Sequence, residues 1–189
     1  DLESVRRSVE AIRDTGCPFM LMHCTSAYPT AYEDVRLGAM AQLREAFDVP
    51  VGLSDHSLGT YAGLGAVALG AAAVEKHFTI SRQWPGPDNP ISIEPGELKD
   101  LIIGSRAIFA ARGGSKTILP IERPVIDFAY ASVVTIADVK AGVELSTDNV
   151  WVKRPGDGPI MASDLESVLG RVARRYLAAN VQVSRDDFE

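Results

Sequence analysis

Histidine is the residue type in this sequence whose placement most directly suggests chemistry. The chain contains three histidines, His23, His56 and His77, and each stands at or beside the end of a short apolar stretch. Two neutral imidazoles from neighbouring strands can share one divalent metal ion, which then keeps positions open for water and a substrate oxygen. Lewis-acid catalysis requires such open positions. The competing interpretation is that each histidine is a hydrogen-bonded structural residue.

Acidic residues beside two of these histidines could complete such a site. Asp55 precedes His56, and Glu75 stands two residues before His77, so both are candidates to accept a hydrogen bond from the imidazole nitrogen that does not bind the metal. Glu75 falls within a predicted strand, where a buried carboxylate is costly unless it is paired or functional. Neighbouring strand residues face opposite sides, which disfavours a pair between Glu75 and Lys76.

Further polar side chains follow the same strand ends. Ser26 and Ser54 could donate to an anionic phosphate or carboxylate, or could simply cap the helices that follow. Tyr28 could face a ligand or cover the rim of the fold, and a stiff Pro-Gly-Pro loop could present Asp88 to a ligand or be a plain turn. Cys24 is expected to be a buried, inert thiol, because no feature of the sequence identifies a base that would activate it.

The composition is that of an ordinary folded protein, and it narrows the range of partners. The 189 residues are 46% hydrophobic, and 19 basic against 25 acidic side chains give a net charge of −6, which gives no support to a nucleic-acid or anionic-membrane partner. No apolar run approaches the roughly 18 residues of a membrane-spanning helix, and no secretory signal is recognised. Cys17 and Cys24 stand too close together to staple a domain, so reduced thiols in a cytoplasmic protein are expected.

Short apolar strands alternate with helical segments in the first part of the chain. Strands are predicted at residues 18–23, 50–53 and 73–78, and helices at 2–12, 34–47, 62–69 and 95–111. This order predicts parallel strands covered by helices, in a barrel or in an open doubly wound sheet. Both architectures carry their active sites at the carboxyl ends of the strands, where the histidines fall.

The pattern changes after about residue 116. Residues 119–127 include two prolines and are expected to form a linker between a first domain, residues 1–118, and a second, residues 128–189. Short β-rich stretches and a capping-box motif in the second domain predict a small mixed β module. The predicted strands are 131–136, 150–152, 172–177 and 181–183, and the predicted short helix spans 163–170.

Six motifs resemble those of bacterial N-acetylneuraminate (sialic acid) synthases. Four of them are HCTSAYPTAYEDVRLGAM (23–40), VGLSDHSLGTYAGLGAVALGA (51–71), EKHFT (75–79) and PGPD (85–88). The other two, FAYASVV (128–134) and WVKRPGDG (151–158), resemble the antifreeze-like (SAF) domain of that family. The resemblance implies an α/β fold, in which the C-terminal part of a (β/α)8 TIM barrel, about three βα units, is followed by a small β-clip SAF domain.

The resemblance also implies an activity, a cofactor and an assembly. Members of the family condense phosphoenolpyruvate with N-acetylmannosamine, assisted by a divalent metal ion for which Mn²⁺ is expected and Mg²⁺ or Co²⁺ are alternatives. The implied assembly is a homodimer, in which the SAF domain of one protomer reaches over the barrel mouth of its partner.

The same resemblance assigns roles to residues of this sequence. His56 and His77 would hold the metal, and Glu75 would be the base for the water that adds during the reaction. Ser26 and Ser54 would lie at phosphoenolpyruvate, although family members often carry Asn at the position of Ser26. The amino sugar would meet Tyr28, Glu75 and Asp88 of one protomer together with Phe128 and Arg154 of its partner.

Compared with that family, the chain begins in the helix before the sixth barrel strand. The first five strands, and the lysines that grip phosphoenolpyruvate, are therefore expected to be missing. Three strands cannot close a barrel, and a parallel sheet with an open edge is prone to aggregate, so the 189 residues alone are expected to be inactive. Two alternatives stay open: a sibling synthase acting on the legionaminic or pseudaminic acid precursors, and a non-catalytic binding or assembly module derived from a synthase.

Overall fold

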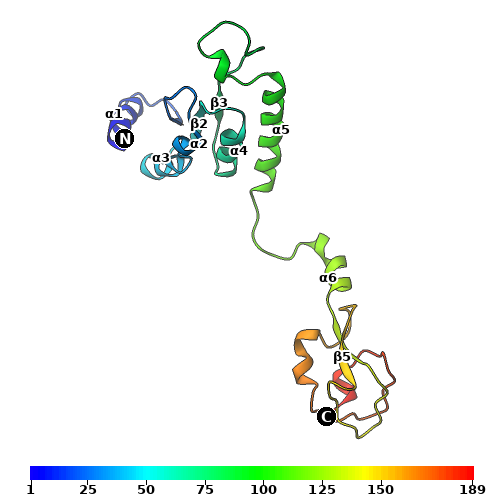
Figure 1. Cartoon of the computed structure of the whole chain (residues 1–189). Coiled ribbons are helices and arrows are strands. Elements are labelled where there is room, and N and C mark those ends of the chain that lie inside the picture. Colours follow the sequence, from blue (N-terminus) through cyan, green and yellow to red (C-terminus); the bar gives the residue numbers. More distant parts are fainter. The chain divides into compact units, whose positions relative to one another are not determined.

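The computed structural model describes all 189 residues, which form two compact units, Asp1–Gly114 and Ser115–Glu189 (Figure 1). Each unit has its own hydrophobic core. No helix in the chain has the length and apolar character needed to cross a membrane.

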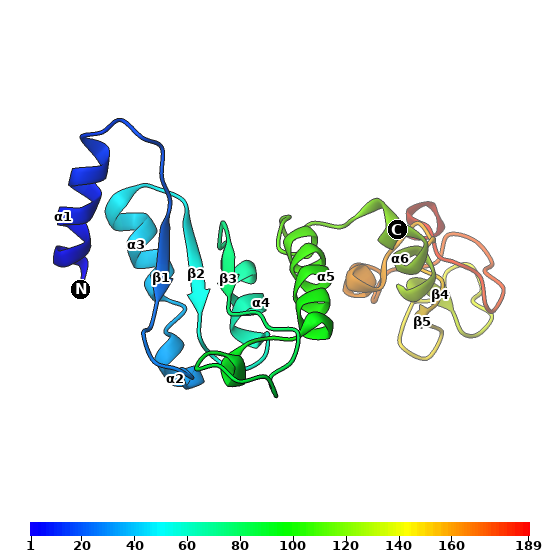
Figure 2. The ribbon, with the colours of Figure 1, turned by 90° about the horizontal axis from the view of Figure 1, so that it is seen from above.

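The first unit is built on a parallel three-stranded sheet in the order β1 (Leu21–Cys24), β2 (Val51–Asp55) and β3 (Val74–Lys76) (Figure 2). Its helices are α1 (Leu2–Arg13), α2 (Tyr32–Val35), α3 (Ala39–Phe47), α4 (Tyr61–Ala68) and α5 (Pro95–Ala111). Helices α3 and α4 pack on the sheet, α1 packs against α3, and α5 packs against α4. Parallel strands joined through covering helices are the repeating βα unit from which α/β barrels and open α/β sheets are built.

The side chains of the sheet alternate between two faces, and the strand register aligns them across the strands. Val51 and Leu53 of β2 are buried in the core with the helices, together with Met40 and Phe47 of α3. Gly52 lies between them in sequence and faces the other way. A Cβ at this position would lie 2.6 Å from both the Met22 sulfur and the Ala73 carbonyl oxygen, so no larger residue fits without displacing backbone.

Local backbone geometry corrects one predicted helix. The segment 34–47, predicted as a single helix, is split into α2 and α3, because Arg36 takes a left-handed conformation with φ 50°. Helix α5 starts at Pro95 as expected, and Glu94 and Glu97 cap its first turn reciprocally. Helix α1 is capped by the Asp1 side chain, which accepts from the Ser4 backbone N–H.

The second unit is a small β structure with few regular elements. Strands β4 (Ser132–Thr135) and β5 (Val150–Lys153) pair antiparallel, and its helix is α6 (Arg123–Ala129). Short 3-10 helices span Pro120–Glu122, Ala162–Ser167 and Arg185–Asp187. Ten buried apolar side chains form its core: Val133, Val139, Leu145, Val150, Ile160, Val168, Ala173, Leu177, Val183 and Phe188.

The structure adds to or differs from the expectations for the second unit in three details. The segment 119–127, predicted as a linker, is largely helical, and Pro120 and Pro124 are compatible with this because they lie in first turns of helical segments, where a missing N–H costs nothing. The expected strands 172–177 and 181–183 form only isolated bridges, such as those of Leu177 with Val139 and Gln182 with Val134. The helix expected at 163–170 is a 3-10 helix that ends at Ser167.

Candidate active site

A rung of polar residues crosses the first sheet at the carboxyl ends of its strands. Cys24 on β1 pairs in register with Ser54 on β2, and Ser54 pairs with Glu75 on β3. The Ser54 hydroxyl donates a hydrogen bond of 2.6 Å to Glu75 Oε1. The Glu75 side chain is exposed, so the expected cost of burying its carboxylate does not arise in this chain.

Two histidines stand directly beyond this rung. His56 lies two residues after Ser54, and His77 lies two residues after Glu75, so both continue the same side of the alternation. Their ring centroids are 5.1 Å apart, with the ring planes at 80°. The ring of Tyr28 lies 4.2 Å from that of His56 and 5.9 Å from that of His77. The structure therefore brings these three predicted site residues together.

One nitrogen of each imidazole faces an oxygen acceptor. His56 Nδ1 lies 3.0 Å from the Thr25 carbonyl oxygen, which can only accept, so this nitrogen carries the proton. His77 Nδ1 lies 3.6 Å from Asp88 Oδ2. The expectation that Asp55 and Glu75 fill this role is wrong, because Asp55 pairs with Lys76 and Glu75 accepts from Ser54.

The donor set of this pair fits a divalent ion. With Nδ1 of each ring turned to an oxygen, the Nε2 lone pairs are the ones left to bind a metal. No cluster of three or more His, Cys, Asp or Glu side chains with metal-binding geometry occurs in the chain. The pair therefore offers two ligands, which leaves most positions of an ion to water and substrate oxygen.

The third histidine belongs to the core. His23 is buried and its Nε2 lies 2.8 Å from the Val35 carbonyl oxygen. It pairs in register with Leu53 of the core, one residue away from the polar rung. The one-residue difference turns its side chain to the opposite face of the sheet. His23 is therefore a hydrogen-bonded structural residue, the competing interpretation that the sequence left open for each histidine.

Cys24 differs from the expectation of a buried thiol. It is exposed, and its sulfur lies 3.8 Å from His56 Nδ1 and 4.0 Å from the Ser26 hydroxyl. Ser26 is also exposed, on the loop that follows β1. The imidazole near Cys24 comes from the next strand, so no spacing within the first motif could reveal it.

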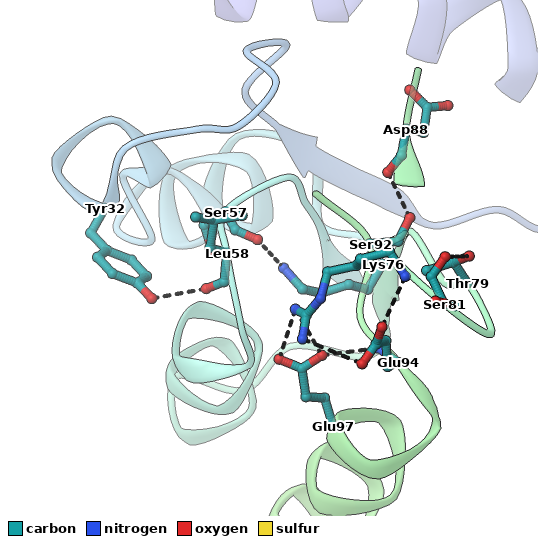
Figure 3. Close-up of polar contacts among 11 residues, drawn as sticks. Tyr32, Ser57, Leu58, Lys76, Thr79, Ser81, Asp88, Ser92, Glu94 and Glu97 are labelled. Carbon is teal, nitrogen blue, oxygen red and sulfur yellow. Dashed lines mark hydrogen bonds and ion pairs between the residues drawn. The ribbon is translucent and has the colours of Figure 1, made fainter. Parts of the chain in front are cut away.

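Asp88 reaches the histidine pair from a loop that is fixed at both ends. The Thr79 N–H donates to the Ile93 carbonyl. The Ser92 hydroxyl donates to the Asp88 carbonyl oxygen at 2.8 Å (Figure 3). Arg82 ties the same loop to α5, because its guanidinium lies 3.1 Å from Glu97 and 3.5 Å from Glu94. These contacts hold the loop that presents the Asp88 carboxylate to His77.

Sequence reasoning missed a buried ion pair beside the site. Lys76 Nζ lies 2.8 Å from Asp55 Oδ2, and the two side chains are 3% and 0% exposed. Their opposite charges, each directly before a site histidine, are the sequence signal that could have found the pair.

Phe128 and Arg154 belong to the second unit. Phe128 lies on α6 with 68% of its surface exposed. Arg154 follows β5 and lines a pocket of about 350 Å³ together with Val134, Lys153, Pro155, Asn180 and Gln182. These two predicted site residues therefore belong to a different compact unit from the histidine pair.

The parallel sheet with its covering helices, and the polar residues at its strand ends, have the arrangement of part of an α/β barrel. Residues 1–117 match the NeuB family, and residues 130–189 match the SAF domain. The chain belongs to the NeuB family.

Individual relatives agree with this assignment. The chain is 42% identical over 173 residues to the uncharacterized protein MJ1065 of Methanocaldococcus jannaschii, covering 90% of this chain and 51% of that protein. It is 42% identical over 156 residues to the N,N'-diacetyllegionaminic acid synthase of Campylobacter jejuni, covering 82% of this chain and 46% of that enzyme.

A solved structure is also similar. The N-acetylneuraminic acid (sialic acid) synthetase of Leptospira borgpetersenii, crystallised with citrate, superposes with a TM-score of 0.62 at 35% identity, covering 67% of this chain and 45% of that one. The chain thus spans about half the length of the relatives it matches.

Proposed function

We propose that the protein works as a nonulosonic acid synthase, which condenses phosphoenolpyruvate with an N-acetylated amino sugar and releases phosphate. The observation that carries the proposal is the His56–His77 pair, 5.1 Å apart, beside the hydrogen-bonded Ser54 and Glu75. Membership of the NeuB family supports the reaction class.

The two imidazoles would hold the divalent ion, with Mn²⁺ expected first and Mg²⁺ or Co²⁺ as alternatives. When bound, the ion supplies Lewis-acid polarisation of the sugar aldehyde, which offsets the negative charge that develops on its oxygen. The contact with the Thr25 carbonyl keeps His56 in the tautomer that leaves Nε2 free. Asp88 Oδ2, 3.6 Å from His77 Nδ1, would favour the same tautomer of His77.

Glu75 is the residue we assign as the base. The enol carbon of phosphoenolpyruvate attacks the aldehyde carbon, and a water then adds to the cationic carbon that results. The tetrahedral carbon so formed expels phosphate by breaking its bond to the phosphate oxygen, which leaves the ketone. The Glu75 carboxylate takes the proton from that water, while Ser54 holds one carboxylate oxygen in place. The second carboxylate oxygen, which Ser54 does not contact, is the one available to the water.

The remaining polar groups would bind the two substrates. Ser26 and Ser54 would contact phosphoenolpyruvate, and Tyr28 and Asp88 would contact the sugar from their positions around the histidine pair. Phe128 and Arg154 would complete the site of the partner protomer in a homodimer. The Arg154 guanidinium is a permanently charged planar donor, suited to an amide carbonyl or hydroxyl of the sugar.

Two sugars are candidates for the second substrate. N-acetylmannosamine corresponds to the sialic acid synthetase that superposes on the chain, and the diacetamido precursor of legionaminic acid corresponds to the more similar Campylobacter enzyme. Few pocket contacts separate such sugars, so both belong in the assay.

The metal site can be tested on the 189-residue chain itself. We expect the chain to remove Mn²⁺ from the free pool measured by electron paramagnetic resonance, and His56→Ala and His77→Ala each to lose this binding. His23→Gln is the matched control, because His23 is buried away from the pair, and it should bind Mn²⁺ as the wild type does. Absence of Mn²⁺, Mg²⁺ or Co²⁺ binding would favour a non-catalytic module instead.

Turnover can be tested after the chain is fused to the amino-terminal half of the Leptospira enzyme and, separately, of the Campylobacter enzyme. Phosphate release from phosphoenolpyruvate with each sugar is the readout. If both fusions prefer the same sugar, this chain determines the preference. If the preferred sugar changes with the amino-terminal half, that half determines it. No turnover with either sugar, in fusions that fold, would contradict the proposed function.

A further inference from the structure

The buried pair of Asp55 and Lys76 has a specific place relative to the site. Asp55 directly precedes His56, Lys76 directly precedes His77, and the two charged residues are register partners across β2 and β3. Their side chains are almost fully buried and meet at 2.8 Å. Because neighbouring strand residues face opposite sides, the ion pair lies on the face of the sheet opposite to the one that carries the two histidines.

The pair also grips the residue after His56. Asp55 Oδ1 accepts a hydrogen bond of 2.8 Å from the Ser57 N–H. Lys76 Nζ donates to the Ser57 carbonyl oxygen, a contact that Figure 3 shows. His56 therefore stands between Asp55, a member of the pair, and Ser57, which the pair binds. The backbone of His56 is further held through its carbonyl, which accepts from the Thr30 N–H at 3.0 Å.

A contribution to the free energy of folding is a weak explanation for the buried charges of Asp55 and Lys76. A buried ion pair loses much of its attraction to desolvation, and apolar side chains of similar shape are often as stabilising or more so. What apolar side chains cannot supply is directional bonding to both peptide groups of Ser57. The contacts made by Asp55 and Lys76 thus fix the position of the Ser57 backbone more than they stabilise the fold.

We propose that Asp55 and Lys76 are positioning residues, which clamp the ends of β2 and β3 so that the imidazoles of His56 and His77 face one shared cation. The shared cation rests on the proposed function. The spacing of the two rings is a separate property of the fold and can be measured without metal.

The test uses the 189-residue chain with labelled histidine and a double variant, Asp55→Asn with Lys76→Met. Asn at position 55 keeps an acceptor for the Ser57 N–H, and Met fills the volume of the lysine stem, so the fold has the best chance of surviving. Ser57→Ala is the matched control, because its hydroxyl is buried without a hydrogen-bond partner while its peptide groups make the contacts to the pair.

Two readouts follow each variant once circular dichroism has shown that it is folded. The first is the nuclear Overhauser contact between the His56 and His77 rings in the absence of metal. The second is the Mn²⁺ concentration that broadens both ring signals, with the His23 signal as internal reference. We expect the double variant to lose the ring contact and to need about 10- to 100-fold more Mn²⁺, the scale on which outer-shell partners act, and Ser57→Ala to change neither.

An unchanged ring contact in the folded double variant would overturn the proposal. Should the double variant fail to fold, Asp55→Asn alone carries the test with the same readouts and the same expected directions. A wild-type chain that shows the ring contact but no Mn²⁺ effect would refute the metal site and leave the clamp to be judged on the ring contact.

Discussion

The Ser54 hydroxyl donates to the Glu75 carboxylate at 2.6 Å, across the register that joins β2 to β3. This bond occupies one carboxylate oxygen and fixes the direction of the other. Two neighbouring parallel strands thereby place a hydroxyl donor and a carboxylate at one edge of the sheet, beside the histidine pair.

Replacement of Glu75 tests its role as the base. In the fusions described above, Glu75→Gln should lower the rate of phosphate release by about 10²- to 10⁴-fold, the usual contribution of a positioned acid or base. Ser54→Ala removes one hydrogen bond to a charged group, so a loss of roughly 10-fold is expected. Glu45→Gln, on α3 away from the strand ends, is the control. Unchanged turnover in Glu75→Gln would remove Glu75 from the mechanism.

His23 should respond differently from the two site histidines. His23→Ala removes the partner of the buried Val35 carbonyl and leaves a small void, so the free energy of unfolding should fall by about 2 kcal/mol. Urea unfolding measures this change, and the affinity for Mn²⁺ in the folded variant should stay as in the wild type. A variant with normal stability and lost Mn²⁺ binding would place His23 in the site after all.

The alternation of strand side chains explains how much of the site the sequence could predict. The sequence predicts that His56 and His77 lie together because the carboxyl ends of parallel strands lie at one edge of a sheet, and the structure brings their rings together. His23 met the same criterion, yet it falls one residue out of step with Cys24, Ser54 and Glu75. Without the register, the sequence does not say which face a residue occupies, and a shift of one residue reverses it.

The contacts that involve loops and neighbouring strands could not be predicted from the sequence for a related reason. The acceptor of His56 is a backbone carbonyl, that of Thr25, and backbone atoms carry no sequence signature. The break between α2 and α3 depends on a left-handed Arg36, a conformation that arginine rarely adopts. In the second unit, several β-rich stretches form only isolated bridges. A short β-rich sequence does not show whether it will form a full strand or a single bridge.

Gly52 is predicted to tolerate no side chain. In Gly52→Ala, the new Cβ would meet the Ala73 carbonyl oxygen at 2.6 Å, and backbone cannot yield as a flexible side chain does. The free energy of unfolding should fall by about 1–3 kcal/mol. Gly38→Ala is the matched control, because φ there is −60° and a Cβ would meet nothing within 4 Å. That variant should gain about 0.4–1 kcal/mol, and equal losses at both sites would contradict the packing argument.

The last prediction concerns acid and the second unit, where Asp187 is buried. Burial by itself raises the pKa of the Asp187 carboxyl, but the Ser184 N–H and hydroxyl and the Arg175 guanidinium all donate to it and together lower the pKa below its ordinary value of 3.8. The folded unit thus favours the charged carboxylate. The stabilisation is complete above the unfolded pKa and is lost as the pH falls from about 3.8 through the folded pKa.

The measurement compares Asp187→Asn with the otherwise unchanged chain in a Trp84→Phe background, where Trp151 of β5 is the fluorescent reporter of the second unit. The difference in unfolding free energy between the two should be constant near neutral pH and should shrink as the pH drops below about 3.8. Asp186→Asn, at the exposed neighbouring position, should show no such dependence. A difference that persists unchanged to the lowest pH would mean that the Asn variant acts through shape and not through the lost charge.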